Sequence, residues 1–193
     1  MSNIAILLLA AGASSRMKGR DKLMEPVQGM PLLNLICRRA AQTGLPCYAT
    51  VPTLDHPRVS ATGTARVVAV PDASEGMSAS IRAGVRALEE NIEAVMILPC
   101  DMPELQTEDF STLANRFRGA ASPVLRATSS EGTPGHPVLF PRRCFAELSQ
   151  ITGDQGARIL LRDQEVELIA LPGQRALTDL DTPEAWARWR ANQ

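Results

Sequence analysis

The sequence contains few of the residues that build metal centres and redox pairs. It has two histidines and four cysteines in 193 residues, and no two cysteines form a CxxC pair. These counts argue against a zinc site or a redox dithiol. We therefore expect a reduced protein whose cysteines are small buried apolar side chains. The four are Cys37, Cys47, Cys100 and Cys144.

An excess of charge of one sign is also missing. The formal net charge is −1, and charged residues make up 21% of the chain, so no overall field would hold nucleic acid or an anionic membrane. The apolar start lacks the basic region of a signal peptide, and the run 4–9 is too short to span a membrane. These absences predict a cytoplasmic protein without a nucleic-acid or membrane partner, in which any binding of polyanions is local.

Two common nucleotide-binding patterns are absent as well. The first apolar run is followed by Gly12 and then by Gly19 and Arg20, which fits neither GxxxxGK[ST] nor GxGxxG. The missing Gly-x-Gly argues against a dinucleotide-binding dehydrogenase.

The loop after the apolar run 4–9 is suited to a phosphate chain. The run itself predicts a strand buried on both faces. The loop opens with three residues whose small side chains let a backbone approach a bound group, namely Ala10, Ala11 and Gly12. Four cations then lie within seven residues: Arg16, Lys18, Arg20 and Lys22. A small backbone followed by cations favours phosphate binding, and the alternative is a tight turn before an exposed basic loop.

Strand and helix patterns alternate along the rest of the chain. Expected strands are 47–51, 65–70, 95–98, 121–128, the region around 138–140, and 165–171. Expected helices are 31–41, 76–90, 107–117, 141–151, a segment that starts at Asp154 or Gln155, and one led by Pro183. This order predicts a single domain over 1–193 with a three-layer α/β/α, Rossmann-like, mostly parallel sheet.

Asp101 stands at the carboxyl end of the strand expected at 95–98. A lone carboxylate in an apolar stretch must be paired, protonated or bound to a cation. Ligands of open parallel sheets bind beyond the carboxyl ends of the strands, which is also where Gly12 lies. We therefore expect a phosphate and metal site here. The alternative is that Asp101 caps the helix expected at 107–117, for which Thr107 is the better cap.

Two acids close to the carboxyl terminus would point in the same direction. Asp179 and Asp181 have the period-two spacing of an extended segment. They precede Thr182 and Pro183, which suit the start of a helix without any functional role. The cap explains the geometry of the segment, but it does not explain the two acids.

Other candidate residues also have a purely structural explanation. Ser80 lies in the first turn of the helix that begins near Gly76, where free backbone donors suit a polar ligand or the serine simply serves as a cap. His136 lies in the stiff GTPGHP turn as a structural hydrogen-bonding residue or a catalyst. Asp154 and Arg158 are four residues apart and could form a pair on one helix face.

Taken together, these motifs resemble the molybdenum-cofactor nucleotidyltransferases, the MobA-like family of the nucleotide-diphospho-sugar transferase fold. The similarity covers nearly the whole chain. LLAAGASSRMKGRDK is similar to the family signature LAAGxSxRMGxxK, PCDMP to its (G/C)DMP metal motif, and DLDTPEA to its closing D-x-D-T-P-E motif. EGMSAS, GTPGHPVLF and TGDQGAR resemble its cytidylyltransferase branch. LAAG, rather than the LAGG of guanylyl-transferring members, resembles the same branch.

The resemblance implies attack by a terminal phosphate of molybdopterin on the α-phosphate of CTP, which yields the cytosine dinucleotide cofactor and pyrophosphate. It implies Arg16, Lys22 and Asp101 as catalytic residues, with Mg²⁺ as the cofactor. The metal ligands would be Asp101, Asp181 and Asp179. The nucleotide would contact Leu9, Ala10, Ala11, Gly12 and Ser80, and the acceptor would contact His136, Asp154 and Arg158.

The sequence leaves several alternatives open. The donor could be GTP, the acceptor could be a sugar or polyol phosphate, and a non-catalytic module could carry or insert a cofactor. The resemblance also implies transient contact with a molybdenum hydroxylase or its maturation chaperone. Lys18 stands where the signature has glycine, so Lys18 competes with Lys22 for the phosphates, and we favour Lys22. Asp179 and Asp181 are not distinguished as metal ligands.

Overall fold

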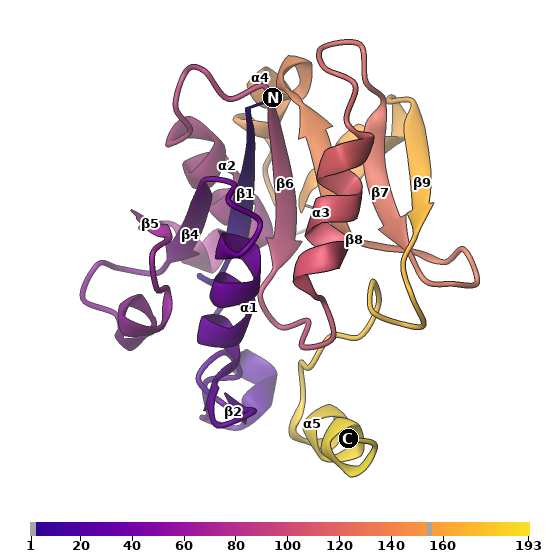
Figure 1. Ribbon diagram of the computed structural model, residues 1–193. Helices are drawn as coiled ribbons and strands as arrows, with labels where there is room; N and C mark the ends of the chain where they lie inside the picture. The colour runs from indigo at the N-terminus through magenta and orange to yellow at the C-terminus, as the bar shows by residue number, and fades with distance from the viewer. Residues whose placement is uncertain (1–2, 154–155) are drawn as a thin grey trace.

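A seven-stranded sheet runs through the computed structural model, which describes residues 3–153 and 156–193 (Figure 1). The strand order is β5-β4-β1-β6-β8-β7-β9. β8 runs antiparallel to β6 and β7, and the other neighbours are parallel, so the prediction of a mostly parallel sheet is confirmed. The strands are β1 Ile4–Leu9, β4 Cys47–Val51, β5 Arg66–Ala69, β6 Ala94–Pro99, β7 Val124–Thr128, β8 Pro134–Pro141 and β9 Val166–Ala170.

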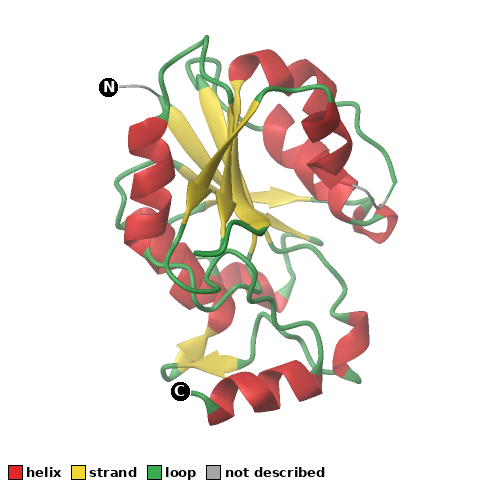
Figure 2. Cartoon of the chain, turned by 90° about the vertical axis from the view of Figure 1, so that its right-hand side faces the viewer, coloured by secondary structure: helices red, strands yellow, loops and turns green. Residues whose placement is uncertain are grey.

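β1 forms the middle of the sheet because it is apolar on both faces. Every residue of β1 is buried, and alternate side chains enter two separate cores. Ile6 and Leu8 pack with α1 (Leu32–Ala41) and α3 (Thr107–Arg116), which lie in front of the sheet in Figure 1. Leu7 packs on the opposite face with α2 (Met77–Arg86) and α4 (Phe145–Leu148). Figure 2 shows helices on both sides of the sheet, as the three-layer prediction requires.

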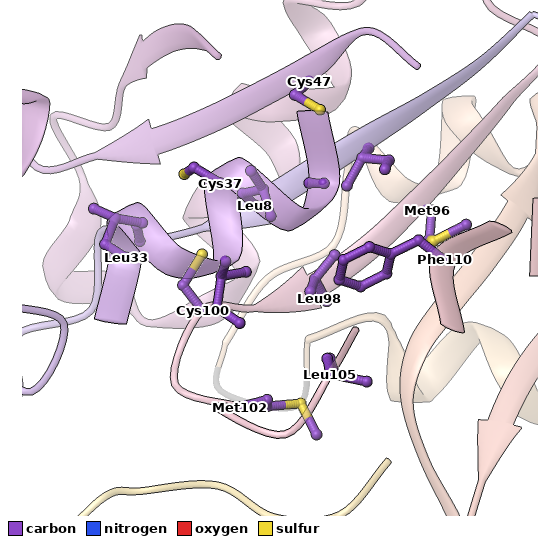
Figure 3. Packing of buried hydrophobic residues seen from close by; sticks show 14 of the residues in the cluster. Leu8, Leu33, Cys37, Cys47, Met96, Leu98, Cys100, Met102, Leu105 and Phe110 are labelled. Carbon is purple, nitrogen blue, oxygen red and sulfur yellow. The ribbon is translucent and has the colours of Figure 1, made fainter. Parts of the chain in front are cut away.

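The four cysteines are free and buried, as expected. Figure 3 shows Cys37, Cys47 and Cys100 among the apolar side chains of one core. Burial, with a smaller contribution from Cys47, raises the pKa of Cys37 to about 12, and burial raises the pKa of Cys47 to about 11. These thiols are therefore protonated packing groups at neutral pH.

Three helix predictions need correction. The segment 141–151 forms only a 3₁₀ turn, Arg142–Cys144, followed by the four-residue α4. The next predicted helix appears as 3₁₀ turns over Gly156–Arg162, and its expected start at Asp154 or Gln155 lies outside the described residues. Thr107 is not the cap of α3. Gln106 is the cap, because it forms a reciprocal capping box with Asp109. No helix in the described ranges has the length and apolar character needed to cross a membrane.

The segment 174–181 crosses the start of β8 before it reaches the last helix, α5 (Pro183–Ala191). Thr182 caps α5, as expected, by accepting a hydrogen bond from the N–H of Ala185. Both views place α5 beyond one end of the sheet, beside the small hairpin of β2 (Pro26–Val27) and β3 (Met30–Pro31) (Figures 1 and 2). The last helix therefore holds the preceding acidic segment from the side away from the sheet.

The crossing requires a glycine at position 135. The N–H of His136 donates to the carbonyl of Ala176 at 2.9 Å. A Cβ atom added at Gly135 would lie 1.9 Å from the same carbonyl oxygen, which is backbone and cannot rotate away. The contact between β8 and the crossing segment is therefore as close as two backbones allow.

We expect Gly135→Ala to lower the free energy of unfolding by about 1–3 kcal/mol, because the added carbon pushes the crossing segment off β8. Urea denaturation measures the change. Gly12→Ala is the matched control, since a Cβ there meets no described atom within 4 Å. An unfolding free energy for Gly135→Ala equal to that of the control would show that the contact is not tight.

Candidate active site

Segments remote in sequence line a cavity of about 540 Å³ at the carboxyl ends of β1 and β6. The loop after β1, the start of α2, the residues after β6, the start of β8 and the crossing segment all contribute to it. The expected site residues that line it are Leu9, Gly12, Arg16, Lys22, Ser80, Asp101, His136, Asp179 and Asp181. The structure therefore brings together most of the residues that the motifs indicated.

Lys22 is the centre of an ion cluster in this cavity. Its Nζ atom donates hydrogen bonds to Oδ2 of Asp101 and to Oδ1 of Asp181, both at 2.5 Å. The two carboxylate oxygens therefore lie within twice that distance of each other, with the lysine ammonium in contact with both. Nη2 of Arg16 lies 3.0 Å from Oδ2 of Asp181, and the Arg16 side chain is 70% exposed. Arg16 thus approaches the cluster from the solvent.

Backbone hydrogen bonds place the two acids side by side. The N–H of Cys100 donates to the carbonyl of Leu9 at 3.2 Å, so the hydrogen bonds between β1 and β6 continue up to the residue before Asp101. The N–H of Leu180 donates to the carbonyl of Asp101 at 3.0 Å. The indole N–H of Trp186 in α5 donates to the carbonyl of Leu180 at 3.1 Å. Asp181 is therefore positioned by the strand on one side and by the last helix on the other.

Burial and charge act in opposite directions on this cluster. Burial raises the pKa of Asp101, and the charges of Asp181 and Asp179 add to the rise while Lys22 opposes it. Burial also acts to raise the pKa of Asp181, but hydrogen bonding and charge from Lys22, with Arg16, lower it overall. Burial acts to lower the pKa of Lys22, and the two carboxylates more than offset this and raise it. Lys22 is therefore a firmly protonated cation at neutral pH.

The carboxylates suit a divalent metal ion. Oδ1 of Asp101 is buried and has no hydrogen-bond partner in the described part of the chain, so it remains available to a ligand. Carboxylate oxygens are the hard ligands that magnesium prefers, and substrate phosphates commonly supply the others. Within residues 3–153 and 156–193, no three His, Cys, Asp or Glu side chains form a ready-made metal site. A metal would thus be held by Asp101 and Asp181 together with substrate oxygens.

The two competing lysines of the loop point to different places. Lys22 lines the cavity, whereas Nζ of Lys18 donates to Oε1 of Glu184 in α5 at 3.0 Å on the exposed surface. Lys18 also has a φ of 53°, in the left-handed region that favours glycine. This backbone conformation explains why glycine suits the position in the signature to which the loop is similar.

The expected nucleotide-binding residues divide into two groups. Gly12 and Ser80 line the cavity together with Leu9. Ala10 and Ala11 are buried, and Ala11 packs in an apolar cluster with Val70 and Ala79, so these two residues can offer a ligand only backbone atoms. Ser80 does not cap α2. The cap is Gly76, which has no side-chain hydrogen bond to offer.

The expected acceptor residues are only partly placed. His136 lines the main cavity and also an adjoining hollow of about 510 Å³, whose apolar walls include Ile81 and Phe140. Asp154 lies outside the described residues. Arg158 belongs to the 3₁₀ segment Gly156–Arg162, and its side chain is also outside the description.

Sequence reasoning missed two arginines. Arg126 on β7 lines both the cavity and the hollow, and its Nε atom donates to the carbonyl of Gly135 at 3.1 Å. Arg58 lies behind the loop that follows β1 and is 2% exposed. Neither belongs to a local motif, and an arginine in a polar loop after β4 is expected to be solvated.

Comparison with known proteins shows the family to which the sequence belongs. The MobA-like NTP transferase domain matches residues 6–168. A probable molybdenum cofactor guanylyltransferase of Trichormus variabilis is 29% identical over 190 residues, which cover 95% of this chain and 89% of that protein. The molybdenum cofactor cytidylyltransferase of Escherichia coli K12 is 27% identical over 191 residues, which cover 95% of this chain and 94% of that protein.

A solved structure shows the same fold. Rv0371c from Mycobacterium tuberculosis H37Rv, in complex with manganese, superposes with a TM-score of 0.81 at 22% identity and covers 97% of each chain. The expectation of the nucleotide-diphospho-sugar transferase fold is thereby confirmed. The motifs that line the cavity and the family match over residues 6–168 lead to one conclusion: the chain belongs to the MobA-like NTP transferase family and is a nucleotidyltransferase.

Proposed function

We propose that this protein is a CTP:molybdopterin cytidylyltransferase. A phosphate oxygen of molybdopterin attacks the α-phosphorus of CTP, the bond from that phosphorus to the bridging oxygen of the β-phosphate breaks, and pyrophosphate leaves. The observation that carries the proposal is the cluster of Lys22 with Asp101 and Asp181 beside the glycine-containing loop, in one cavity. The relatives from Trichormus variabilis and Escherichia coli, a probable guanylyltransferase and a cytidylyltransferase of the molybdenum cofactor, support that cofactor as the product class.

The reaction asks the protein mainly for positioning and for neutralisation of charge. Lys22 would place a partly buried positive charge next to the phosphates, and Arg16 would meet them at the mouth of the cavity. Asp101 and Asp181 would hold Mg²⁺, with Asp179 close by. When bound, the metal would neutralise phosphate oxygens. The structural neighbour from M. tuberculosis was solved in complex with manganese, which supports a divalent ion as the cofactor.

The acceptor side of the proposal rests on the hollow that adjoins the cavity. Its walls combine apolar side chains with His136 and Arg126, which suits an acceptor that carries both a flat organic ring and a phosphate. Asp154 and Arg158 remain proposed members of this pocket on the strength of the motif alone. Acceptor and nucleotide would meet where the two spaces join, near Met77 and His136.

The choice of CTP rests on the LAAG sequence. Ala11 packs against Val70 and Ala79, so its methyl group would act on the nucleotide through the spacing between the loop and α2 rather than by direct contact. A guanylyltransferase is the second candidate, and the Trichormus relative is the observation that favours it. We further propose a cytoplasmic location and transient contact with a molybdenum hydroxylase or its maturation chaperone.

The nucleotide and the acceptor are tested by pyrophosphate release. We expect release from CTP only when molybdopterin is present, and a kcat/KM for CTP about 10-fold or more above that for GTP. Faster release from GTP would make the second candidate correct. Release with a sugar phosphate or polyol phosphate but not with molybdopterin would show that the proposed acceptor is wrong. If no acceptor gives release of pyrophosphate, the protein would instead be a non-catalytic carrier of a cofactor.

Asp101→Asn should lower kcat/KM by about 10²-fold or more, because a preorganised charge at the reacting phosphates is lost. It should also weaken binding of Mn²⁺ measured by electron paramagnetic resonance. Asp55→Asn, a change at an exposed acid outside the cavity, is the matched control and should alter neither quantity. Unchanged Mn²⁺ binding in Asp101→Asn would remove this residue from the metal site.

The two lysines of the loop can be compared directly. Lys22→Gln should abolish most activity, because the cavity loses its partly buried cation, whereas Lys18→Gln should keep activity within about 2-fold since it loses only an exposed ion pair. Steady-state kinetics at saturating CTP measures both. Equal losses in the two variants would show that Lys18 also serves the phosphates.

A further inference from the structure

Arg58 uses every hydrogen-bond donor that its side chain has. Its Nη1 donates to the carbonyls of Ala10 and Gly12 at 2.6 and 2.8 Å, and its Nη2 donates to Oγ of Ser14 at 3.1 Å and to Oδ1 of Asp21 at 2.7 Å. Its Nε completes a two-point contact with Asp21, at 2.8 Å from Oδ2. A guanidinium group carries five N–H donors, and all five are bound here, at four residues of one loop.

These bonds close the loop after β1 into a ring that includes the neighbours of Lys22. Oγ of Ser14 accepts a hydrogen bond from the backbone N–H of Lys22 at 3.3 Å and donates to Oδ1 of Asp21 at 3.4 Å. The same Oδ1 accepts the N–H of Leu23 at 3.0 Å. The backbone of Lys22 is therefore fixed on both sides by groups that Arg58 holds.

Arg58 also orients the backbone of the loop. The carbonyls of Ala10 and Gly12 point toward the guanidinium, and in a trans peptide the N–H of the following residue points the opposite way. The N–H groups of Ala11 and Ala13 therefore point away from Arg58. In the described part of the chain neither N–H has a hydrogen-bond partner, so both remain available to an anion.

We propose that Arg58 is a positioning residue for nucleotide binding: with Asp21 and Ser14 it holds the loop in the one shape that presents Lys22 and the free backbone N–H groups to a triphosphate. Arg58 does not line the 540 Å³ cavity. It lines a separate hollow of about 300 Å³ together with Ser14 and Asp21, so at the cavity that holds the ion cluster it acts only through the loop. Only the need for a nucleoside triphosphate at this loop rests on the proposed function.

The chemistry of the contact requires arginine. A lysine ammonium has three donors and no planar fork, so it cannot span two carbonyls, a hydroxyl and both oxygens of a carboxylate. We expect Arg58→Lys to lower kcat/KM for the nucleotide by about 10²-fold through a loop displaced from its productive position. The KM for the acceptor should stay within about 2-fold, because the hollow near β8 is built from other elements.

The test combines kinetics with direct binding of CTP and GTP in the presence of Mg²⁺ by titration calorimetry. Arg58→Lys is accompanied by Ser14→Ala and Asp21→Asn, which remove single members of the ring and leave a folded protein to assay where Arg58→Lys does not fold. Arg66→Lys is the matched control, because Arg66 is an exposed arginine paired with Glu89 outside the cavity. We expect weaker nucleotide binding in all three ring variants and none of this loss in the control.

A merely structural role makes a different prediction. It would lower the thermal midpoint of the ring variants while nucleotide affinity at room temperature and the KM for the nucleotide stay at wild-type values, and this result would overturn the inference. Wild-type protein that binds neither CTP nor GTP would overturn the proposed function instead, and this inference with it. Nucleotide binding by the wild type that is undiminished in the ring variants would overturn the inference alone.

Discussion

A single ammonium group between two carboxylates organises the functional end of this molecule. Lys22 comes from the loop after β1, Asp101 from the end of β6, and Asp181 from the segment that precedes the last helix. Two acids this close in a partly buried site would repel each other, and the lysine is what makes their proximity stable. The remaining architecture brings these three residues to one place and leaves one oxygen of Asp101 without a hydrogen-bond partner among the described residues.

The central part of the fold and most of the expected residues that line the candidate cavity could be predicted from the sequence. β1 and β6 are continuous apolar runs bounded by polar loops, and runs of this length predict strands that are buried on both faces in the middle of a sheet. Asp101 and the acids at 179 and 181 stand out because a carboxylate next to apolar strands must be paired, protonated or bound to a cation. Motifs of this kind are local, and each could be recognised without knowledge of the contacts.

The features that could not be predicted depend on contacts between distant segments. Nothing near Arg58 in the sequence indicates that its side chain packs against a loop more than thirty residues earlier. Nor does the sequence there indicate that all the N–H donors of Arg58 form hydrogen bonds with that loop. The 3₁₀ turns at 142–144 and 156–162 replace expected helices, because short amphipathic segments take the conformation that packing allows. The cap at Gln106 depends on an exchange of hydrogen bonds with Asp109 that the stronger capping propensity of Thr107 concealed.

Because β8 runs antiparallel to its neighbours, the sheet contributes both the ends of parallel strands and the start of β8 to the same edge. The parallel strands β5, β4, β1 and β6 end at the sheet edge that carries the loop after β1, whereas the turn between β7 and β8, at 129–133, brings the beginning of a strand to that same edge. A surface turn tolerates changes of length better than the strands that it connects. A change of length at 129–133 would therefore shift the start of β8, where Gly135 and His136 line the cavity, and leave the loop after β1 as it is.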